Sequence, residues 1–332
     1  QARNIIAFMD LGEQYRIDNS HWNPLTTVQP DNSSNNLYDE VKDLGIRDIQ
    51  SCNSILDNAY NAYGILGGED YEKIESARRL EASEYTLNSQ LGYISLRTAL
   101  NSDEVLAVAY EYTYNGKTYQ VGEFSTDGIN APNALILKLL KGTATSPQTA
   151  LWDLMMKNIY YLGGNQIQSE KFKLNIQYKN DSSGVYVNYI NEGAIKNQLL
   201  IRVMNLDRLD SRNEQSPDGK FDFVENYTIY SSSGRLIFPV VEPFGSHLRK
   251  MLNNEALADK YCYDALYDST KIAAQEMTEK NKFRIAGEYQ ASSGNVIRLN
   301  AMNVPRGSVV VTAGGQTLME NVDYTVDYTM GT

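Results

Sequence analysis

An acidic loop between residues 207 and 222 holds the side chains of this chain that are best suited to chemistry. Calcium is bound by clustered carboxylate and carbonyl oxygens, and its binding loops place a glycine at the sharpest bend. Gly219 stands in a Pro-Asp-Gly turn of this loop. The loop is therefore a candidate calcium site, and apart from calcium we expect no cofactor; the candidate ligands are Asp207, Asp210, Asn213, Asp218 and Asp222.

The same loop has a second interpretation, which the sequence leaves open. Its spacing does not match a complete EF-hand loop. Three cationic side chains, Arg208, Arg212 and Lys220, reduce the negative charge of the loop. A solvated turn that is held by local salt bridges would have the same composition.

Patterns that are typical of catalysis are missing from the rest of the sequence. The two histidines, His21 and His247, form no metal-binding pair, and neither His-Glu-x-x-His nor Gly-x-Ser-x-Gly occurs. We expect both histidines to cap, to pack or to lie at the surface. A glycosidase needs two carboxylates beside a cleft, but 41 acidic residues make a chance pair easy to draw. The sequence therefore predicts a protein that is not an enzyme.

Composition limits the partners of this chain. Its 332 residues are enough for two or three domains, and 42% of them are hydrophobic. A formal net charge of −11 makes the surface repel phosphates, so we expect no nucleic-acid partner. The sequence contains no run of 18 apolar residues, so we predict no transmembrane helix. We expect the two cysteines, Cys52 and Cys262, to be buried free thiols.

One short unit occurs three times among the elements that must position these residues. Each copy has Tyr-Thr, an aliphatic residue, four variable residues and Gly; the copies run over 85–92, 227–234 and 324–331. Tyr and Thr favour strands, and the glycine can adopt the positive φ that hairpin loops need. We predict that the unit is a β-hairpin. In the third copy we expect 324–332 to be an unpaired strand, whose partner lies in a missing part of a longer protein.

Hydrophobic patterning places further elements around these hairpins. We expect helices at 46–63, 71–79, 134–141, 147–162 and 246–280, and strands at 4–9, 171–178, 184–190, 199–204 and from 283 onward. The predicted fold class is α+β and rich in β structure, with antiparallel sheets and hairpins and with helical insertions. We divide the chain into three regions: 1–125 with the first hairpin unit, 126–282 with the acidic loop and the second unit, and a C-terminal β region at 283–332.

Several longer blocks of the sequence are typical of one family. The longest reads Gly-Arg-Leu-Ile-Phe-Pro-Val-Val-Glu-Pro-Phe-Gly-Ser-His-Leu over 234–248. Other blocks lie at 8–13, 85–96, 103–109, 259–261, 266–270, 280–283, 301–309, 313–315 and 323–328. On these blocks, which are spread over nearly the whole chain, the sequence resembles the SprA (Sov) gliding-motility family.

The resemblance implies a function and a location. Members of this family are very large outer-membrane β-barrels of the Bacteroidetes. They form the translocon of the type IX secretion system, which passes folded cargo to the cell surface and in some members supports gliding motility. They use no cofactor and catalyse no reaction. This chain would then be an internal fragment, a soluble periplasmic or extracellular portion in the cell envelope at the outer membrane. Its partners would be the rest of the parent barrel protein, secreted cargo and other secretion-system proteins.

An alternative function stays open on the residues alone. The chain has 24 tyrosines, and aromatic faces stack on sugars. A stand-alone cell-surface adhesin or a glycan-binding module rich in β structure fits this composition. Exposed aromatic side chains gathered in a groove would favour this alternative.

Overall fold

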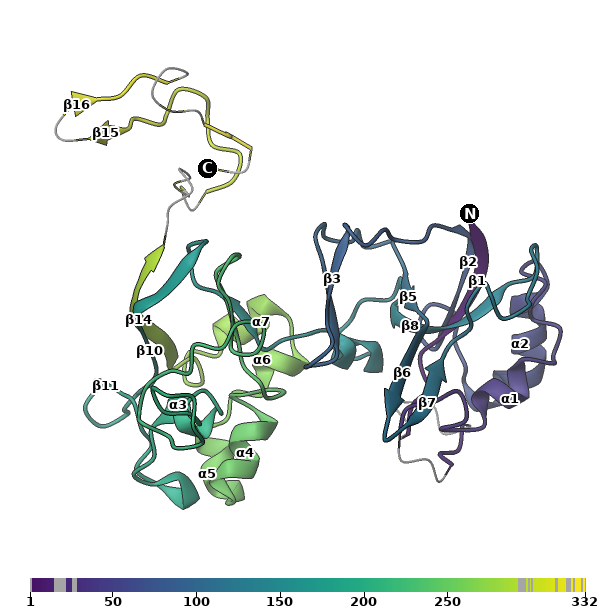
Figure 1. Cartoon of the computed structure of the whole chain (residues 1–332), viewed down its shortest axis with the longest axis horizontal. Helices are drawn as coiled ribbons and strands as arrows, with labels where there is room; N and C mark the ends of the chain where they lie inside the picture. The colour runs from purple at the N-terminus through teal and green to yellow at the C-terminus, as the bar shows by residue number, and fades with distance from the viewer. Residues whose placement is uncertain are drawn as a thin grey trace.

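A computed structural model describes residues 2–14, 22–25, 29–291, 297, 299, 301–313, 316–320, 324, 326–329 and 331. These residues form an α+β fold that is rich in β structure, with antiparallel sheets, hairpins and helical insertions, as predicted. Figure 1 shows two bodies side by side, and the C-terminal stretch extends beyond the second one. We call the part with β1 to β8 the N-terminal body and the part with β9 to β14 the second body.

The N-terminal body is built on a four-stranded sheet. Its order is β2 (Tyr71–Ala77), β1 (Arg3–Phe8), β8 (Leu135–Lys141) and β5 (Leu106–Val108). The central strands β1 and β8 are parallel neighbours, and both outer strands are antiparallel to them. Two separate hairpins complete this body: β3 (Tyr85–Asn88) with β4 (Tyr93–Leu96), and β6 (Tyr110–Tyr114) with β7 (Lys117–Val121).

Both faces of this sheet are covered by apolar side chains. On one face, Ile6, Phe8 and Ile136 share a core with α1 (Leu37–Val41) and α2 (Cys52–Tyr60). On the other face, Ala7 and Leu137 belong to a second cluster. A strand that is buried on both faces reads as an unbroken apolar run. This double burial explains the apolar residues of β8, and the run is broken at Lys138, whose buried amine pairs with Glu13 at 2.5 Å.

Several predicted elements have a different structure. The predicted helices at 134–141 and 71–79 are the strands β8 and β2, and the predicted strand at 199–204 contains α3 (Leu200–Val203). The predicted helix at 147–162 is a 3-10 turn, η2 (Ala150–Leu154), followed by β9 (Ile159–Tyr161). The helix predicted at 46–63 begins only at Cys52 and ends in η1 (Asn61–Tyr63). Periodicity alone does not distinguish a short apolar strand from a helix, and β8 and β2 are strands because both pair with β1.

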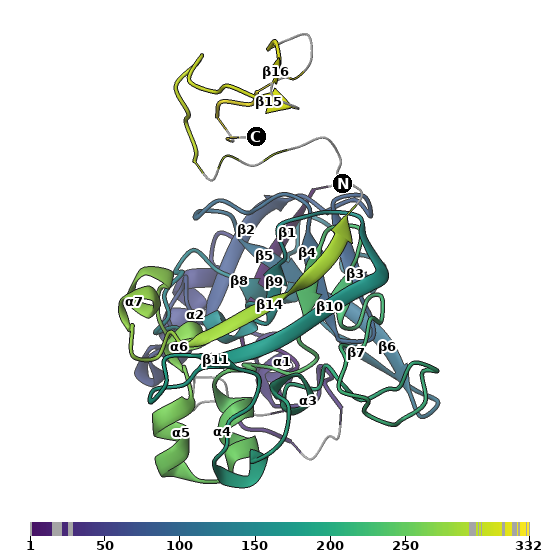
Figure 2. The same ribbon diagram turned by 90° about the vertical axis from the view of Figure 1, so that its left-hand side faces the viewer.

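The second body contains two three-stranded sheets and most of the helices. One sheet has the order β11 (Tyr186–Val187), β10 (Ile167–Lys179) and β14 (Phe283–Ala291), and Figure 2 shows β10 and β14 as a long ribbon. The other has the order β12 (Ile229–Tyr230), β13 (Arg235–Ile237) and β9. The helical elements are η3 (Gly193–Ile195), α3, α4 (Ser246–Leu252), α5 (Glu255–Tyr261), α6 (Ala265–Asp268) and α7 (Lys271–Glu276). The largest buried cluster joins these helices to both sheets.

Strand pairing crosses both of the predicted region boundaries. The strand β8 lies after residue 126 but completes the sheet of the N-terminal body. The strand β14 begins at Phe283 and pairs with β10 from Phe283 to Ala291. The division at 126 therefore falls inside the first body, and the division at 283 falls inside the second.

The third copy of the repeated unit lies in the C-terminal stretch, which also holds the hairpin of β15 (Thr312–Ala313) and β16 (Gln316–Thr317). Three described residues of this copy, Tyr328, Thr329 and Gly331, accept backbone hydrogen bonds from an earlier part of the chain. Leu299 N donates to Gly331 O at 2.8 Å, and Val304 N donates to Tyr328 O at 2.8 Å. No strand is assigned to the described residues of this copy. Within the described residues, the expectation of an unpaired strand is therefore wrong at Tyr328 and Gly331, whose carbonyls are bonded to Val304 and Leu299.

Candidate functional site

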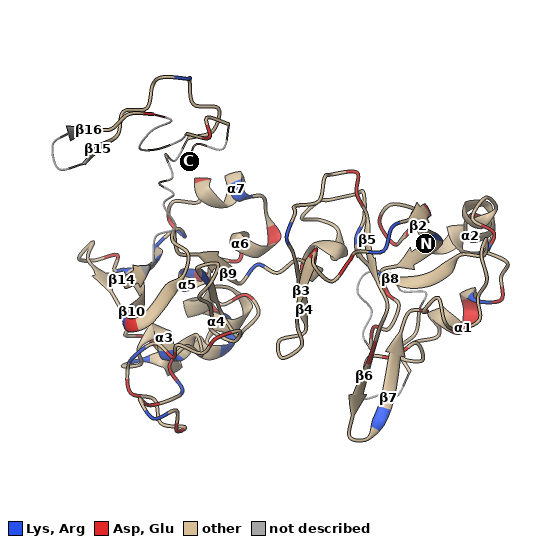
Figure 3. Cartoon of the chain, turned by 45° about the horizontal axis from the view of Figure 1, so that its top comes forward, with Lys and Arg blue, Asp and Glu red and all other residues tan. Residues whose placement is uncertain are grey.

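The predicted calcium ligands all lie in the described loop after α3, where acidic and basic residues alternate in Figure 3. Asp207 is the central one, because its side chain is 0% exposed. Its carboxylate accepts hydrogen bonds from the backbone amides of Asp218, at 3.0 Å, and Gly219, at 3.2 Å. The guanidinium of Arg202 pairs with the same carboxylate at 3.2 Å. Asp207 therefore joins the start of the loop to its Pro-Asp-Gly turn.

The other end of the loop is closed in a similar way. Asp222 accepts hydrogen bonds from the amides of Arg208, at 2.6 Å, and Leu209, at 3.1 Å. Burial raises the pKa of Asp222 above its ordinary value, and the nearby carboxylates of Asp207 and Asp218 add to the increase. The carboxylate oxygens of Asp207 and Asp222 are thus bonded to backbone amides of the loop, and Asp207 also pairs with Arg202 of α3.

The remaining predicted ligands hold local turns. Asp210 accepts from the amides of Arg212, at 2.8 Å, and Glu214, at 3.1 Å. Asp218 accepts from the amide of Lys220 at 3.0 Å, and Asn213 adopts a left-handed backbone with φ of +62°. Among the residues that the structure describes, no group of three or more acidic, histidine or cysteine side chains is arranged to hold a metal ion. The observed contacts are those of a turn held by local bonds, while calcium binding stays a prediction.

The histidines and cysteines take no part in a reactive cluster within the described chain. His247 is half-buried on α4, and its Nε2 lies 2.7 Å from the carbonyl oxygen of Val203, so it packs as predicted. His21 lies outside the described residues. Cys52 and Cys262 are buried and free, which confirms the prediction. Burial raises the pKa of each thiol to about 11.

A second candidate site lies where the first two copies of the repeated unit meet. Both copies are hairpins, β3–β4 and β12–β13, as predicted. The side-chain amide of Asn88, in the first copy, donates from Nδ2 to the backbone carbonyl oxygen of Asn226 at 2.7 Å and to the hydroxyl of Tyr230 at 3.1 Å. The hairpin β3–β4 thus joins the two bodies, and it lies between them in Figure 1.

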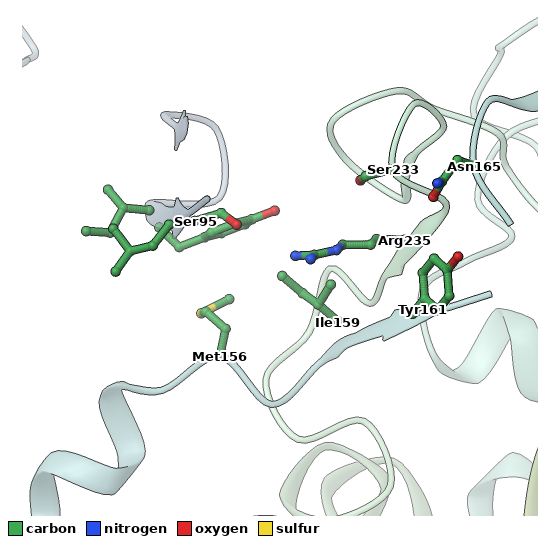
Figure 4. Close-up of a pocket in the computed structure, with 10 residues that line it drawn as sticks. Ser95, Met156, Ile159, Tyr161, Asn165, Ser233 and Arg235 are labelled. Atoms are coloured by element: carbon green, nitrogen blue, oxygen red, sulfur yellow. The ribbon is translucent and has the colours of Figure 1, made fainter. Parts of the chain in front are cut away.

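A groove of about 640 Å³ runs beside this contact. Figure 4 shows the side chain of Arg235 reaching across it, above Ile159 and toward Ser95 and Met156. Within the described residues, the Arg235 guanidinium has no ion pair or hydrogen bond, and no acidic residue lines the groove. The ten lining residues come from both bodies: Tyr93, Ile94, Ser95, Leu96, Met156, Ile159, Tyr161, Asn165, Ser233 and Arg235.

The wall of the groove also contains a buried hydroxyl. Tyr93 is 7% exposed, and its hydroxyl has no hydrogen-bond partner among the described residues. The neighbouring hydroxyl of Tyr230 accepts from Asn88 instead. Burial, and after it the neighbouring Tyr230, raises the pKa of Tyr93 above its ordinary value, so its hydroxyl remains a donor at neutral pH.

The sequence predicts both hairpins but contains no signal that they face one another, so it does not predict the groove.

No protein-family model matches this chain, and no curated protein is similar to it. Within the described residues, none of the helices combines the length and the apolar character that crossing a membrane requires.

Proposed function

We propose that this chain is a non-enzymatic structural and interaction segment of an outer-membrane protein-secretion translocon of the type IX kind, which also serves gliding motility. In this proposal the segment belongs to the cell envelope as a soluble portion on the periplasmic or the extracellular side of the outer membrane. Its partners are the rest of the parent protein, the secreted cargo and other secretion-system proteins. The support begins with the sequence blocks that resemble the SprA (Sov) family.

The proposal rests on one observation: apolar residues of the longest block pack in the protein core. Within 234–248, Leu236, Phe238, Phe244 and Leu248 are at most 3% exposed and belong to the core of the second body. His247, in the same block, packs against the carbonyl of Val203. Resemblance in residues that are needed for packing favours a shared architecture, and the proposed role is one of architecture and contact.

The position and size of the parent protein test this proposal. An antibody raised against the purified chain is used on fractionated cells of the source organism. We expect it to detect a polypeptide much longer than 332 residues in the outer-membrane fraction. A soluble polypeptide of about this length, absent from the membrane fraction, would contradict the proposal.

One specific observation favours the second candidate, a glycan-binding or adhesive module. Tyrosine rings stack along the hairpin β6–β7, with centroids 6.1 Å apart for Tyr110 and Tyr112 and 5.3 Å apart for Tyr112 and Tyr119. Tyr110 and Tyr114 are 38% and 48% exposed. If these rings bind sugars, a glycan array should give a signal that Tyr110→Ala and Tyr114→Ala both reduce. A signal that survives both substitutions would remove this hairpin as the binding site.

A further inference from the structure

We propose that the groove between the hairpins β3–β4 and β12–β13 binds an extended, acidic segment of another polypeptide, which adds a strand to the free edge of β4. The inference goes beyond the proposed function and does not depend on it. A peptide can join an exposed sheet edge through backbone hydrogen bonds, while neighbouring pockets select its side chains.

The lining of the groove shows that it follows an edge of β4. Four consecutive residues of β4, from Tyr93 to Leu96, line it, and no residue of β3 does. Successive side chains of a strand point to opposite faces. A groove that is lined by four consecutive residues therefore runs along the edge of the strand and not over one of its faces. Among the described residues, β4 pairs with β3 alone. Its other edge therefore has unpaired backbone groups.

The register identifies which backbone groups are available. Arg97 N donates to Glu84 O at 2.9 Å, just beyond the strand ends. Hydrogen-bonded and non-hydrogen-bonded pairs alternate in an antiparallel ladder, so Ser95, two residues earlier, also bonds toward β3. The amides and carbonyls of Ile94 and Leu96 then point away from β3. These groups can pair with an incoming strand.

Charge complementarity identifies the occupant as acidic. Among the described residues, Arg235 is the only charged one that lines the groove, although the chain has a net charge of −11. An arginine offers five donors in a fork that matches a carboxylate. Met156, Ile159 and Tyr161 provide apolar contacts next to it. The volume also lies in the range of ordinary ligand sites. The chemistry therefore fits a strand with one aspartate or glutamate between apolar residues.

The test begins with peptides selected on the purified chain from a phage-displayed library of random heptapeptides. The selected peptide is synthesised with a fluorescent label, and its affinity is measured by fluorescence anisotropy. We expect an acidic residue with apolar neighbours, and we expect Arg235→Gln to weaken binding about tenfold or more. Arg212→Gln is the matched control, because it removes the same charge from an exposed loop and should leave the affinity unchanged.

Backbone pairing is tested on the peptide, so that no change in the protein is required. N-methylation of alternate peptide amides removes donors one at a time, and we expect losses at every second position. Ile94→Pro provides the complementary change in the protein. The proposal is overturned if no peptide is selected, if selected peptides lack an acidic residue, if they bind the Arg235→Gln chain equally well, or if N-methylation has no effect at any position.

Discussion

Asp207 shows how this protein uses a buried charge at the scale of one residue. Its carboxylate holds two backbone amides and Arg202 at once. Asp207→Ala removes the buried acceptor that these part-buried and exposed donors share, so we expect the free energy of unfolding to fall by about 2 kcal/mol. Glu214→Ala changes a side chain of the same loop that is 66% exposed, and it should cost less than about 0.5 kcal/mol. Urea unfolding measures both, and equal losses would show that Asp207 does not hold the loop.

The thiols give a second prediction at this scale. A pKa of about 11 leaves Cys52 and Cys262 almost fully protonated at pH 8, and both side chains are shielded from solvent. We expect a thiol reagent to label neither cysteine in the folded chain at pH 8 and to label both in denaturant. Ser54→Cys places a thiol on the exposed side of α2 as a positive control. Rapid labelling of the native chain would disprove the predicted burial.

At the scale of elements, the repeated unit provides a matched pair of glycines. Gly92 and Gly234 close the first two hairpins with φ of +72° and +60°. A Cβ on Gly92 would meet nothing within 4 Å, whereas a Cβ on Gly234 would lie 1.6 Å from the carbonyl oxygen of Gly164. We expect Gly92→Ala to cost about 1 kcal/mol from backbone strain alone. Gly234→Ala must also displace a backbone segment, and should cost more than about 3 kcal/mol.

Thermal or urea unfolding of the two variants measures this difference. Gly92→Ala is the control for Gly234→Ala, because it makes the same substitution at the same position of the repeat. Similar losses for both variants would mean that the close contact of the second hairpin with Gly164 does not constrain the fold.

Local patterns predicted the elements whose signals are local. The hairpins follow from Tyr-Thr and a glycine at fixed spacing, and β1 and the helical stretch after 246 follow from their apolar patterns. The strand β8 was predicted as a helix, because the apolar run at 134–141 fits either structure. Its strand state depends on parallel pairing with β1, about 130 residues away in sequence. A short window of sequence contains no signal of such long-range pairing.

The candidate sites show the same limit. The residues of the acidic loop were named from the sequence, but their spacing did not reveal that the oxygens of Asp207 and Asp222 accept hydrogen bonds from amides of the loop. The groove depends on which faces two hairpins present to each other, across more than a hundred residues of chain. Contacts of this kind are decided by tertiary packing.

At the scale of the whole molecule, the two bodies meet at repeated hairpins, and the longest family-like block belongs to the core of the second body. We therefore propose a framework role for the segment, in which its folding matters more than any single reactive group. Substitutions that unfold the segment should impair secretion, whereas substitutions of exposed residues outside the groove should not.

Cargo export in cells provides a direct test of the proposed framework role. Gly234→Ala and Gly92→Ala are introduced separately into the chromosomal gene, and immunoblots compare one type IX cargo protein in the periplasm and outside the cell, with the level of the parent protein measured alongside. We expect cargo to accumulate in the periplasm of the Gly234→Ala cells and to be exported normally by the Gly92→Ala cells. Normal export by Gly234→Ala cells, with the segment shown to be unfolded by its protease sensitivity, would contradict the claim.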